Sequence, residues 1–329
     1  MKRVGNLIES IADYHNLVLA YYKASKGKQF KKEVQQFAAQ FEENMRSLHE
    51  SLLSDCMEVG GYHTFFVYDP KERLICVAPF YQRVLHHALM NICHPYFDNY
   101  QIEDSFASRI GKGTYAALDK AMVYNKQYAW CLKLDVRHYF DSIDHHILYS
   151  LLERRFKDSQ LLTAFKNIID SYWVEEKHGL PIGNLSSQYF ANHYLALADH
   201  WVKEQLHVRA YVRYMDDILV WDNNREALLV LGRQIRMYLS EQLHLQLKIF
   251  QLYPTCRGCE FLGYHLSSWG RVLSKKSKKR FRLRMHLYYD NYNSGYWDEG
   301  VLQQHLLPLV AFTQKANSIQ FRRHVMLSL

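Results

Sequence analysis

Glycine and proline are both scarce in this chain, and long apolar runs are absent. Its 329 residues include only 14 glycines and 6 prolines, against averages of about 7% and 5%. This scarcity excludes collagen-like repeats and argues against an all-β fold with many turns, so we expect long helices. No run of about 18 apolar residues occurs, and Glu9 and Asp13 interrupt the N-terminus too early for a signal peptide. We therefore expect a soluble cytoplasmic protein that does not bind membranes.

The cysteine pattern also excludes a disulfide framework. Four of the six cysteines are isolated in the sequence, and the other two form a single C-x-x-C without a second pair at zinc-finger spacing. The isolated ones are Cys56, Cys76, Cys93 and Cys131, and the pair is Cys256 and Cys259. We expect buried or half-buried thiols in a reducing compartment.

Acidic residues are missing from one stretch, which holds all of the excess positive charge. The chain has 41 Lys and Arg against 33 Asp and Glu, a formal net charge of +8. Residues 271–284 (RVLSKKSKKRFRLR) contain eight basic residues and no acidic one, so the rest of the chain is balanced. Such a patch indicates a polyanionic partner, either nucleic acid or an anionic membrane surface, although a solvated helix face has the same pattern.

Periodicity predicts a mixed helix and strand protein. Two helical segments are expected within residues 6–59, separated by a basic linker at Lys23–Lys32, and a later helix over residues 80–95 is expected to stop at Pro95. Further helices are expected over Ser159–Tyr172, Leu185–Leu206 and Arg225–Leu243. Expected strands are Thr64–Tyr68, Arg73–Val77, Trp130–Leu134, Ala210–Tyr214, Ile218–Trp221 and Phe261–His265.

Three aspartates follow apolar strand patterns and suggest a metal site. Asp135 ends one run, while Asp216 and Asp217 lie between two runs that predict a β-hairpin. Aspartate is also a common turn residue, so these side chains could simply face water. If strand ends bring them together, however, their like charges need cations. Mg²⁺ suits an all-oxygen site, and two such ions can support an in-line phosphoryl transfer.

Four motifs in the same order resemble those of reverse transcriptases. Tyr214–Asp217 (YMDD) resembles the YxDD hairpin of that family, and Asp135 followed five residues later by Phe140 resembles its first catalytic motif. Residues 179–188 (GLPIGNLSSQ) are similar to its Pro-x-Gly loop and helix, and Phe261–Tyr264 (FLGY) to its later FLG[FY] motif. The resemblance covers residues 64–265 and implies an RNA-directed DNA polymerase that uses two Mg²⁺ ions, with Mn²⁺ as a substitute.

The middle motif resembles one branch of the family. Pro181-Ile182-Gly183 stands where retroviral and group II intron enzymes usually carry Pro-Gln-Gly. With the Ser-Gln at residues 187–188 and the chain length, this resembles the reverse transcriptases of diversity-generating retroelements. That resemblance implies cDNA errors at template adenines and a small, basic, ring-forming accessory protein as partner. Ile182 offers only shape and dispersion beside a base pair, which agrees with weak geometry checking.

The resemblance also implies residue roles and an α+β right-hand polymerase fold with fingers, an antiparallel-sheet palm and a small helical thumb. The implied domains are a helical extension (1–60), fingers and palm (61–265) and a basic thumb (266–329). Catalytic metal ligands would be Asp135, Asp216 and Asp217, and nucleotide-binding residues Lys71, Arg73, Phe140, Ile182, Gly183 and Gln188, with Phe140 as a steric gate for dNTPs. Template RNA and the RNA–DNA duplex would contact Arg83, Arg109, Lys112, Lys275, Lys276, Lys278, Lys279 and Arg280.

Some alternatives remain open at this point. Gln251 stands where many relatives carry a lysine that assists pyrophosphate departure, and Lys248 lies three residues earlier. Which of the two, if either, assists the leaving group is left open by the sequence. The enzymatic alternative is a retron or phage-defence reverse transcriptase, although the Asn-Ala-x-x-His and Val-Thr-Gly motifs of retron enzymes are not found. The alternative from another class is an RNA-binding scaffold without activity, which would have no reason to keep three crowded carboxylates. The cell would be a bacterium or a phage-infected host.

Overall fold

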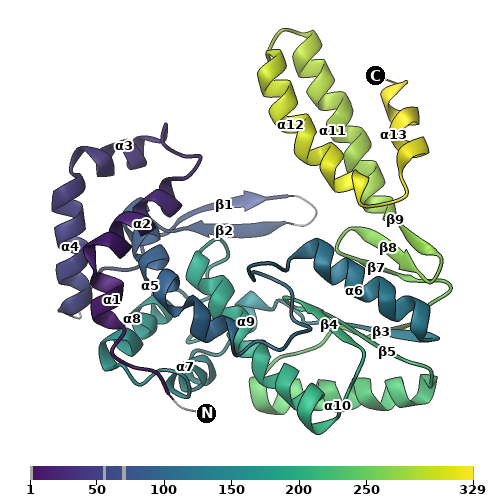
Figure 1. Ribbon diagram of the computed structural model, residues 1–329, viewed down its shortest axis with the longest axis horizontal. Helices are drawn as coiled ribbons and strands as arrows, with labels where there is room; N and C mark the ends of the chain where they lie inside the picture. Colours follow the sequence, from purple (N-terminus) through teal and green to yellow (C-terminus); the bar gives the residue numbers. More distant parts are fainter. Residues whose placement is uncertain (1–2, 55–56, 69–71, 329) are drawn as a thin grey trace. The chain divides into compact units, whose positions relative to one another are not determined.

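The computed structural model describes residues 3–54, 57–68 and 72–328, which form two compact units (Figure 1). Unit 1 consists of Met1–Glu103, Val136–His207 and Ile235–Leu247, and unit 2 of Asp104–Asp135, Val208–Gln234 and Lys248–Leu329. The three domains expected from the sequence remain a prediction. Among the described residues, no helix combines the length and the apolar character that a membrane span requires.

Unit 1 begins with four helices rather than the two helical segments expected. They are α1 (Ile8–Ala12), α2 (Tyr14–Ser25), α3 (Lys32–Ala39) and α4 (Phe41–Leu53). The first break has a clear cause: the Asp13 carboxylate accepts hydrogen bonds from the backbone N–H groups of His15 and Asn16 and so caps α2. The expected linker is confirmed as the break between α2 and α3.

The strand pair and the next helix follow. β1 (His63–Val67) and β2 (Arg73–Val77) form an antiparallel hairpin, as predicted. Helix α5 (Phe80–Asp98) continues past Pro95, so the expected stop at Pro95 is wrong. A proline inside a helix removes one hydrogen bond and crowds the carbonyl four residues before it, but the Pro95 carbonyl still accepts a hydrogen bond from Asn99, so the helix continues.

The remaining helices of unit 1 agree closely with the sequence. A short 3₁₀ helix (Phe140–Ser142) precedes α7 (His145–Glu153), which Asp144 caps. They are followed by α8 (Ser159–Asp170), α9 (Leu185–His200) and a π-helical turn (Trp201–Gln205). Helix α10 (Arg225–Leu243) has the predicted bounds, and its residues are divided between the two units.

A four-stranded antiparallel sheet forms the centre of unit 2. Its strand order is β4-β5-β3-β6, formed by Tyr211–Tyr214, Asp217–Asp222, Trp130–Asp135 and Gln251–Pro254. Helix α6 (Thr114–Gln127) packs on this sheet through Ala117, Leu118 and Ala121, which are fully buried. The sheet therefore has an apolar core that supports polar groups at the strand ends.

A second sheet and three helices complete unit 2. The sheet order is β7-β8-β9, formed by Cys259–Phe261, Tyr264–Ser267 and Gly270–Leu273. The single strand expected over Phe261–His265 is wrong, because Leu262 and Gly263 form a turn with φ angles of +48° and +85°. Helices α11 (Lys275–Asn293), α12 (Glu299–Gln314) and α13 (Ile319–Met326) follow, with α11 and α12 side by side in Figure 1.

Candidate active site

Strand register brings the three predicted carboxylates together in unit 2. Asp135 is the last residue of β3 and pairs directly with Asp217, the first residue of β5. Because β4 and β5 pair through Tyr214 and Asp217, Met215 and Asp216 form a two-residue hairpin loop. Asp216 thus lies close enough to Asp135 and Asp217 for both to act on its ionisation. The carboxylates meet at one end of the sheet, and their catalytic role remains a prediction.

A buried arginine, which the sequence analysis missed, holds this turn. Met215 has a φ of +56°, a left-handed conformation that non-glycine residues seldom adopt but that tight hairpin turns require. Its carbonyl accepts a hydrogen bond from Nη1 of Arg213 at 3.0 Å, and Arg213 is fully buried. A charged residue inside the apolar run of β4 was the signal that could have revealed it. Arg213 therefore stabilises the turn that carries Asp216.

The base of the hairpin has a second anchor. The hydroxyl oxygen of Tyr214 accepts a hydrogen bond at 3.1 Å from Oγ1 of Thr114 at the start of α6. Tyr214 is only partly buried and packs against the apolar core of unit 2. Two side-chain contacts, from Arg213 and Thr114, thus fix the residues on the N-terminal side of Asp216.

The electrostatics of the cluster favour cation binding. Burial, then the charges of Asp217 and Asp135, raise the pKa of Asp216 to about 6. Burial also raises the pKa of Asp217, although Lys133 lowers it in part. Two ammonium groups offset part of the negative charge: Lys248 Nζ lies 2.7 Å from Asp135 Oδ1, and Lys133 Nζ lies 3.4 Å from Asp217 Oδ1. A divalent cation would supply the positive charge that these crowded carboxylates need.

The donor set fits a hard divalent cation. Asp135, Asp216 and Asp217 offer only carboxylate oxygens, the ligands that Mg²⁺ and Mn²⁺ prefer. In the part of the chain that the structure describes, no three His, Cys, Asp or Glu side chains converge into a preformed metal cage. This result agrees with the contacts at the three carboxylates, because two lysine ammonium groups already pair with Asp135 and Asp217.

Lys248, rather than Gln251, lies at the carboxylates. Besides its ion pair with Asp135, the Lys248 N–H donates to the Asp135 carbonyl at 2.9 Å. Gln251 is exposed at the start of β6, and its side-chain oxygen accepts a hydrogen bond from the hydroxyl of Tyr253. Of the two residues left open by the sequence, Lys248 is therefore the one whose side chain contacts a predicted catalytic carboxylate.

Unit 1 brings together three of the predicted nucleotide-binding residues. The N–H of Leu180 donates to the carbonyl of Phe140 at 2.8 Å, and the N–H of Cys76 in β2 donates to the carbonyl of Ile182 at 2.7 Å. Gly183 has a φ of +123°, and a Cβ there would lie 3.0 Å from the Cys76 carbonyl oxygen. The Pro-x-Gly loop is therefore held between the Phe140 turn and β2, and glycine is required at residue 183.

The other predicted nucleotide-binding residues are less closely joined. Arg73 is exposed in β2 and stands two residues before Ile75, whose side chain approaches Gly183, so both project from one face of the hairpin. Lys71 lies outside the described residues. Gln188 is exposed on the second turn of α9. Arg83 forms an ion pair with Glu33 and lies 5.1 Å from the Phe80 ring centroid, so its role in binding nucleic acid remains a prediction.

The predicted nucleic-acid contacts of unit 2 lie in two places. Arg109 and Lys112 precede α6, where Nη1 of Arg109 donates to the Ser105 carbonyl and Lys112 lies over the Phe106 ring. The others lie in the first two turns of α11, where Lys275, Lys276 and Lys279 are exposed and Lys278 and Arg280 are partly buried over aromatic rings. The expected basic helix is confirmed, and its partner remains a prediction.

The cysteines follow the expectation except at one position. Cys76, Cys93, Cys131 and Cys259 are buried free thiols, but Cys256 is exposed because it lies in the turn before β7. Cys56 lies outside the described residues. Burial raises the pKa of the Cys131 thiol, with Cys259 as its neighbour.

The sequence of residues 69–266 matches the family described as "Reverse transcriptase (RNA-dependent DNA polymerase)". Because this match covers more than half of the chain and includes all three carboxylates, the chain belongs to the reverse transcriptase family. Domains of this family generally use divalent metal ions.

Curated relatives are similar over part of the chain. It is 25% identical over 150 residues to the "Uncharacterized 91 kDa protein in cob intron" of Schizosaccharomyces pombe. It is 22% identical over 153 residues to the "Putative COX1/OXI3 intron 2 protein" of Saccharomyces cerevisiae. Each match covers 44% of this chain but only 17% of the relative.

Solved structures confirm the α+β polymerase fold. Telomerase from Candida albicans, in complex with a TWJ fragment of telomeric RNA, aligns with a TM-score of 0.51 at 12% identity and covers 74% of this chain and 55% of that one. Apo telomerase from Candida tropicalis aligns with a TM-score of 0.50 at 10% identity, covering 66% and 48%. At these identities the likeness concerns the fold alone.

Proposed function

We propose that this protein is an RNA-directed DNA polymerase that copies a template RNA into cDNA. One observation carries the proposal: the register of β3 and β5 places Asp135 and Asp217 side by side, with Asp216 on the adjoining turn, inside a sequence that belongs to the reverse transcriptase family. An RNA-binding scaffold would gain nothing from this arrangement, because buried like charges are unfavourable without cations.

The carboxylates would hold the ions that the chemistry needs. Asp135 and Asp216, with Asp217 as a third ligand, would bind two Mg²⁺ ions, which activate the attacking hydroxyl and stabilise the departing pyrophosphate. Arg213 keeps the Asp216 turn in its left-handed conformation. Lys248, beside Asp135, supplies an ammonium group that can donate a proton to the leaving group.

Nucleotide selection is proposed for unit 1. Phe140 would fill the space of a ribose 2′-OH and so favour dNTPs, while Ile182, Gly183 and Gln188 would line the nascent base pair. Arg73 and Lys71 would neutralise the triphosphate. The basic residues near α6 and on α11 would hold the phosphates of the template RNA and of the RNA–DNA duplex.

We further propose that the enzyme belongs to a diversity-generating retroelement and makes errors at template adenines. The support is Ile182 in the Pro-x-Gly loop, which cannot hydrogen-bond to a base and therefore checks its geometry only by shape. The partner would be a small, basic, ring-forming accessory protein, in the cytoplasm of a bacterium or a phage-infected host.

A second candidate is an intron-associated reverse transcriptase. It is favoured by the titles of the curated relatives, which name proteins of the cob and COX1/OXI3 introns. The two candidates share the chemistry and differ in the expected errors, since only the first implies errors concentrated at one template base.

Primer extension tests the shared chemistry. The full chain, a defined RNA template, a DNA primer, dNTPs and Mg²⁺ should yield cDNA, and Asp216→Asn should reduce the rate on the order of 10³-fold while RNA affinity is unchanged. Asp222→Asn, at the far end of the same strand β5, is the matched control and should remain active. A wild-type protein that binds RNA but extends no primer would favour the scaffold.

Sequencing of the cDNA separates the two candidates. Errors concentrated opposite adenines, and reduced in Ile182→Gln because an amide restores hydrogen bonding, support the retroelement. Errors spread evenly over the four template bases reject it and leave the intron-associated enzyme. The reaction is run with and without a candidate accessory protein.

A further inference from the structure

The Phe140 turn and the Pro-x-Gly loop, both in unit 1, are joined by a network of hydrogen bonds. Three backbone bonds link them: His145 N–H to the Lys177 carbonyl (3.0 Å), Gly179 N–H to Ile143 (2.9 Å) and Leu180 N–H to Phe140 (2.8 Å). These contacts lie just before the residues proposed to read the base pair. The spacing between Phe140 and Ile182 therefore depends on how firmly this junction is held.

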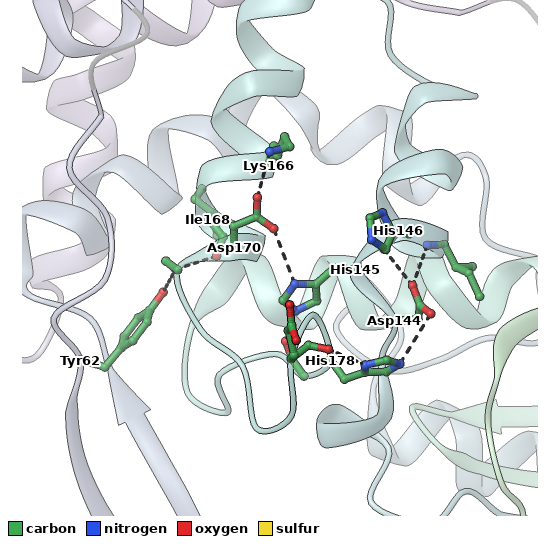
Figure 2. Close-up of polar contacts among 12 residues, drawn as sticks. Tyr62, Asp144, His145, His146, Lys166, Ile168, Asp170 and His178 are labelled. Carbon is green, nitrogen blue, oxygen red and sulfur yellow. Dashed lines mark hydrogen bonds and ion pairs between the residues drawn. The ribbon is translucent and has the colours of Figure 1, made fainter.

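One buried side chain belongs to the junction. His145 is 4% exposed, and its Nε2 lies 2.7 Å from the carbonyl oxygen of Gly179. A carbonyl can only accept, so Nε2 carries the hydrogen and donates it. On the other side of the ring, Nδ1 lies 3.6 Å from Oδ1 of Asp170, which in turn pairs with Lys166 (Figure 2). His145 thus ties the start of α7 to the first residue of the Pro-x-Gly loop.

Gly179 leaves little freedom to the peptide that His145 holds. Its φ is +111°, and an added Cβ would lie 3.2 Å from both the backbone nitrogen and Cγ2 of Val174. Leu180 and Pro181, which follow, are buried. A side chain that fixes the Gly179 carbonyl therefore also fixes the direction in which the loop leaves towards Ile182.

A second tether lies beside the first. Asp144 caps α7, because its Oδ1 accepts from the N–H groups of His146 and Ile147. Its Oδ2 lies 3.6 Å from Nε2 of His178, the residue before Gly179 (Figure 2). The same oxygen lies 3.2 Å from Nδ1 of His244. These two histidines are 39% and 57% exposed, so their contacts are weaker than the buried bond of His145.

The far end of the loop is fixed by β2. The bond from Cys76 N–H to the Ile182 carbonyl and the close approach of Gly183 to Cys76 leave the loop anchored at residue 182. Among the described residues, the side chain of His145 donates the only side-chain hydrogen bond to the backbone of residue 179. Its loss would loosen this end of the loop, which the backbone bonds of Gly179 and Leu180 would then hold without it.

We propose that His145 is a positioning residue for nucleotide selection: its hydrogen bond to the Gly179 carbonyl keeps Ile182 at a fixed spacing from Phe140. The inference rests on the proposed polymerase function, because Phe140 and Ile182 are there assigned to the sugar and the base. Without the bond, the loop and the Phe140 turn move apart more freely, and a ribonucleotide or a mispaired base is excluded less strictly.

Two nearly isosteric variants isolate the hydrogen bond. His145→Gln keeps an N–H donor for the Gly179 carbonyl, whereas His145→Met fills a similar volume without one. His146→Met is the control, because His146 is exposed and donates to the Asp144 cap through its backbone N–H, which the substitution keeps. Each protein is tested with single dNTPs and rNTPs on a fixed RNA template, and its thermal melting is measured in parallel.

We expect His145→Met to raise the KM for the correct dNTP and to lower the dNTP/rNTP discrimination about fivefold, roughly the effect of one buried hydrogen bond, with kcat within about twofold. His145→Gln and His146→Met should retain the wild-type discrimination. Equal discrimination in the Met and Gln variants overturns the proposal. The proposal is also overturned if the His145→Met protein fails to fold while the His145→Gln protein folds, because the hydrogen bond would then serve stability alone. Failure of the wild-type protein to extend any primer rejects the polymerase function instead.

Discussion

Two aspartates of this protein sit in contrasting environments, Asp144 in unit 1 and Asp216 in unit 2. Burial alone would raise the pKa of Asp144, but hydrogen bonds from the Ile147 N–H, from His244 and from the His146 N–H lower it below its usual value. Burial and the neighbouring Asp217 raise the pKa of Asp216 to about 6. Donors stabilise the first carboxylate as an anion within the fold, whereas the second is left needing a cation.

This difference agrees with a structural role for Asp144 and with the metal-binding role proposed for Asp216. A sequence that folds stably places donors around a buried charge. A site that must bind a metal keeps its oxygens available, at the expense of stability. Replacement of each aspartate should therefore change stability in opposite directions.

The largest effect expected concerns stability without metal. Asp216→Asn should increase the free energy of unfolding by about 2 kcal/mol at neutral pH, because it removes a charge whose pKa is raised by about 2 units, each worth about 1.4 kcal/mol, less an allowance for partial exposure. Asp144→Ala should decrease it by about 1–2 kcal/mol through loss of the α7 cap. Urea unfolding in EDTA measures both. If Asp144→Ala stabilised the protein or Asp216→Asn destabilised it, the opposite electrostatic environments assigned to these two carboxylates would be wrong.

Much of this contrast was accessible from the sequence. The sequence favours a helix that begins near Ser142 or Asp144, and the apolar runs around Asp216 predicted a hairpin with its carboxylates at the turn. Strand alternation and capping are local signals, so they are read within a few residues. The apolar run that ends in Asp135 predicted the partner strand, and the resemblance to reverse transcriptases implied that the three carboxylates share one site.

What escaped prediction depends on contacts between distant residues. Arg213 appears in the sequence only as a charge inside an apolar strand, and its bond to the Met215 carbonyl depends on the turn geometry. The Gly179 carbonyl is paired by a histidine 34 residues away. Gly263 lies in a turn and not in a continuous strand, because its φ is left-handed. The pattern FLGY does not reveal this backbone conformation.

The pH dependence should also differ in sign between the two aspartates. Because the folded pKa of Asp216 is raised, the folded protein binds more protons than the unfolded chain between pH 4 and 6, and the contribution of Asp216 is lost as pH rises through about 6. The stability gained by Asp216→Asn should therefore grow from near zero at pH 4 to its full value at pH 7. Denaturation curves in EDTA across this range measure it.

For Asp144 the folded pKa is lowered, so its contribution is present above the unfolded pKa of 3.8 and is lost as pH falls through the folded value. The stability difference between wild type and Asp144→Ala should therefore shrink as pH falls below 4. A difference that is the same at pH 3 and at pH 5 would mean that the donors around Asp144 do not stabilise its charge.

The smallest effect concerns the ammonium groups at the carboxylates of unit 2. Lys248 lies 2.7 Å from Asp135 Oδ1 and competes with an incoming cation for that oxygen. Lys248→Met should therefore tighten Mn²⁺ binding about fivefold, since a partly exposed charge at this distance contributes about 1 kcal/mol. Mn²⁺ titration of the nucleic-acid-free protein, followed by electron paramagnetic resonance, measures the affinity directly. Lys166→Met, which removes an exposed lysine paired with Asp170, is the control and should leave it unchanged. Weaker Mn²⁺ binding in Lys248→Met would mean that Lys248 organises the carboxylates instead of competing for them.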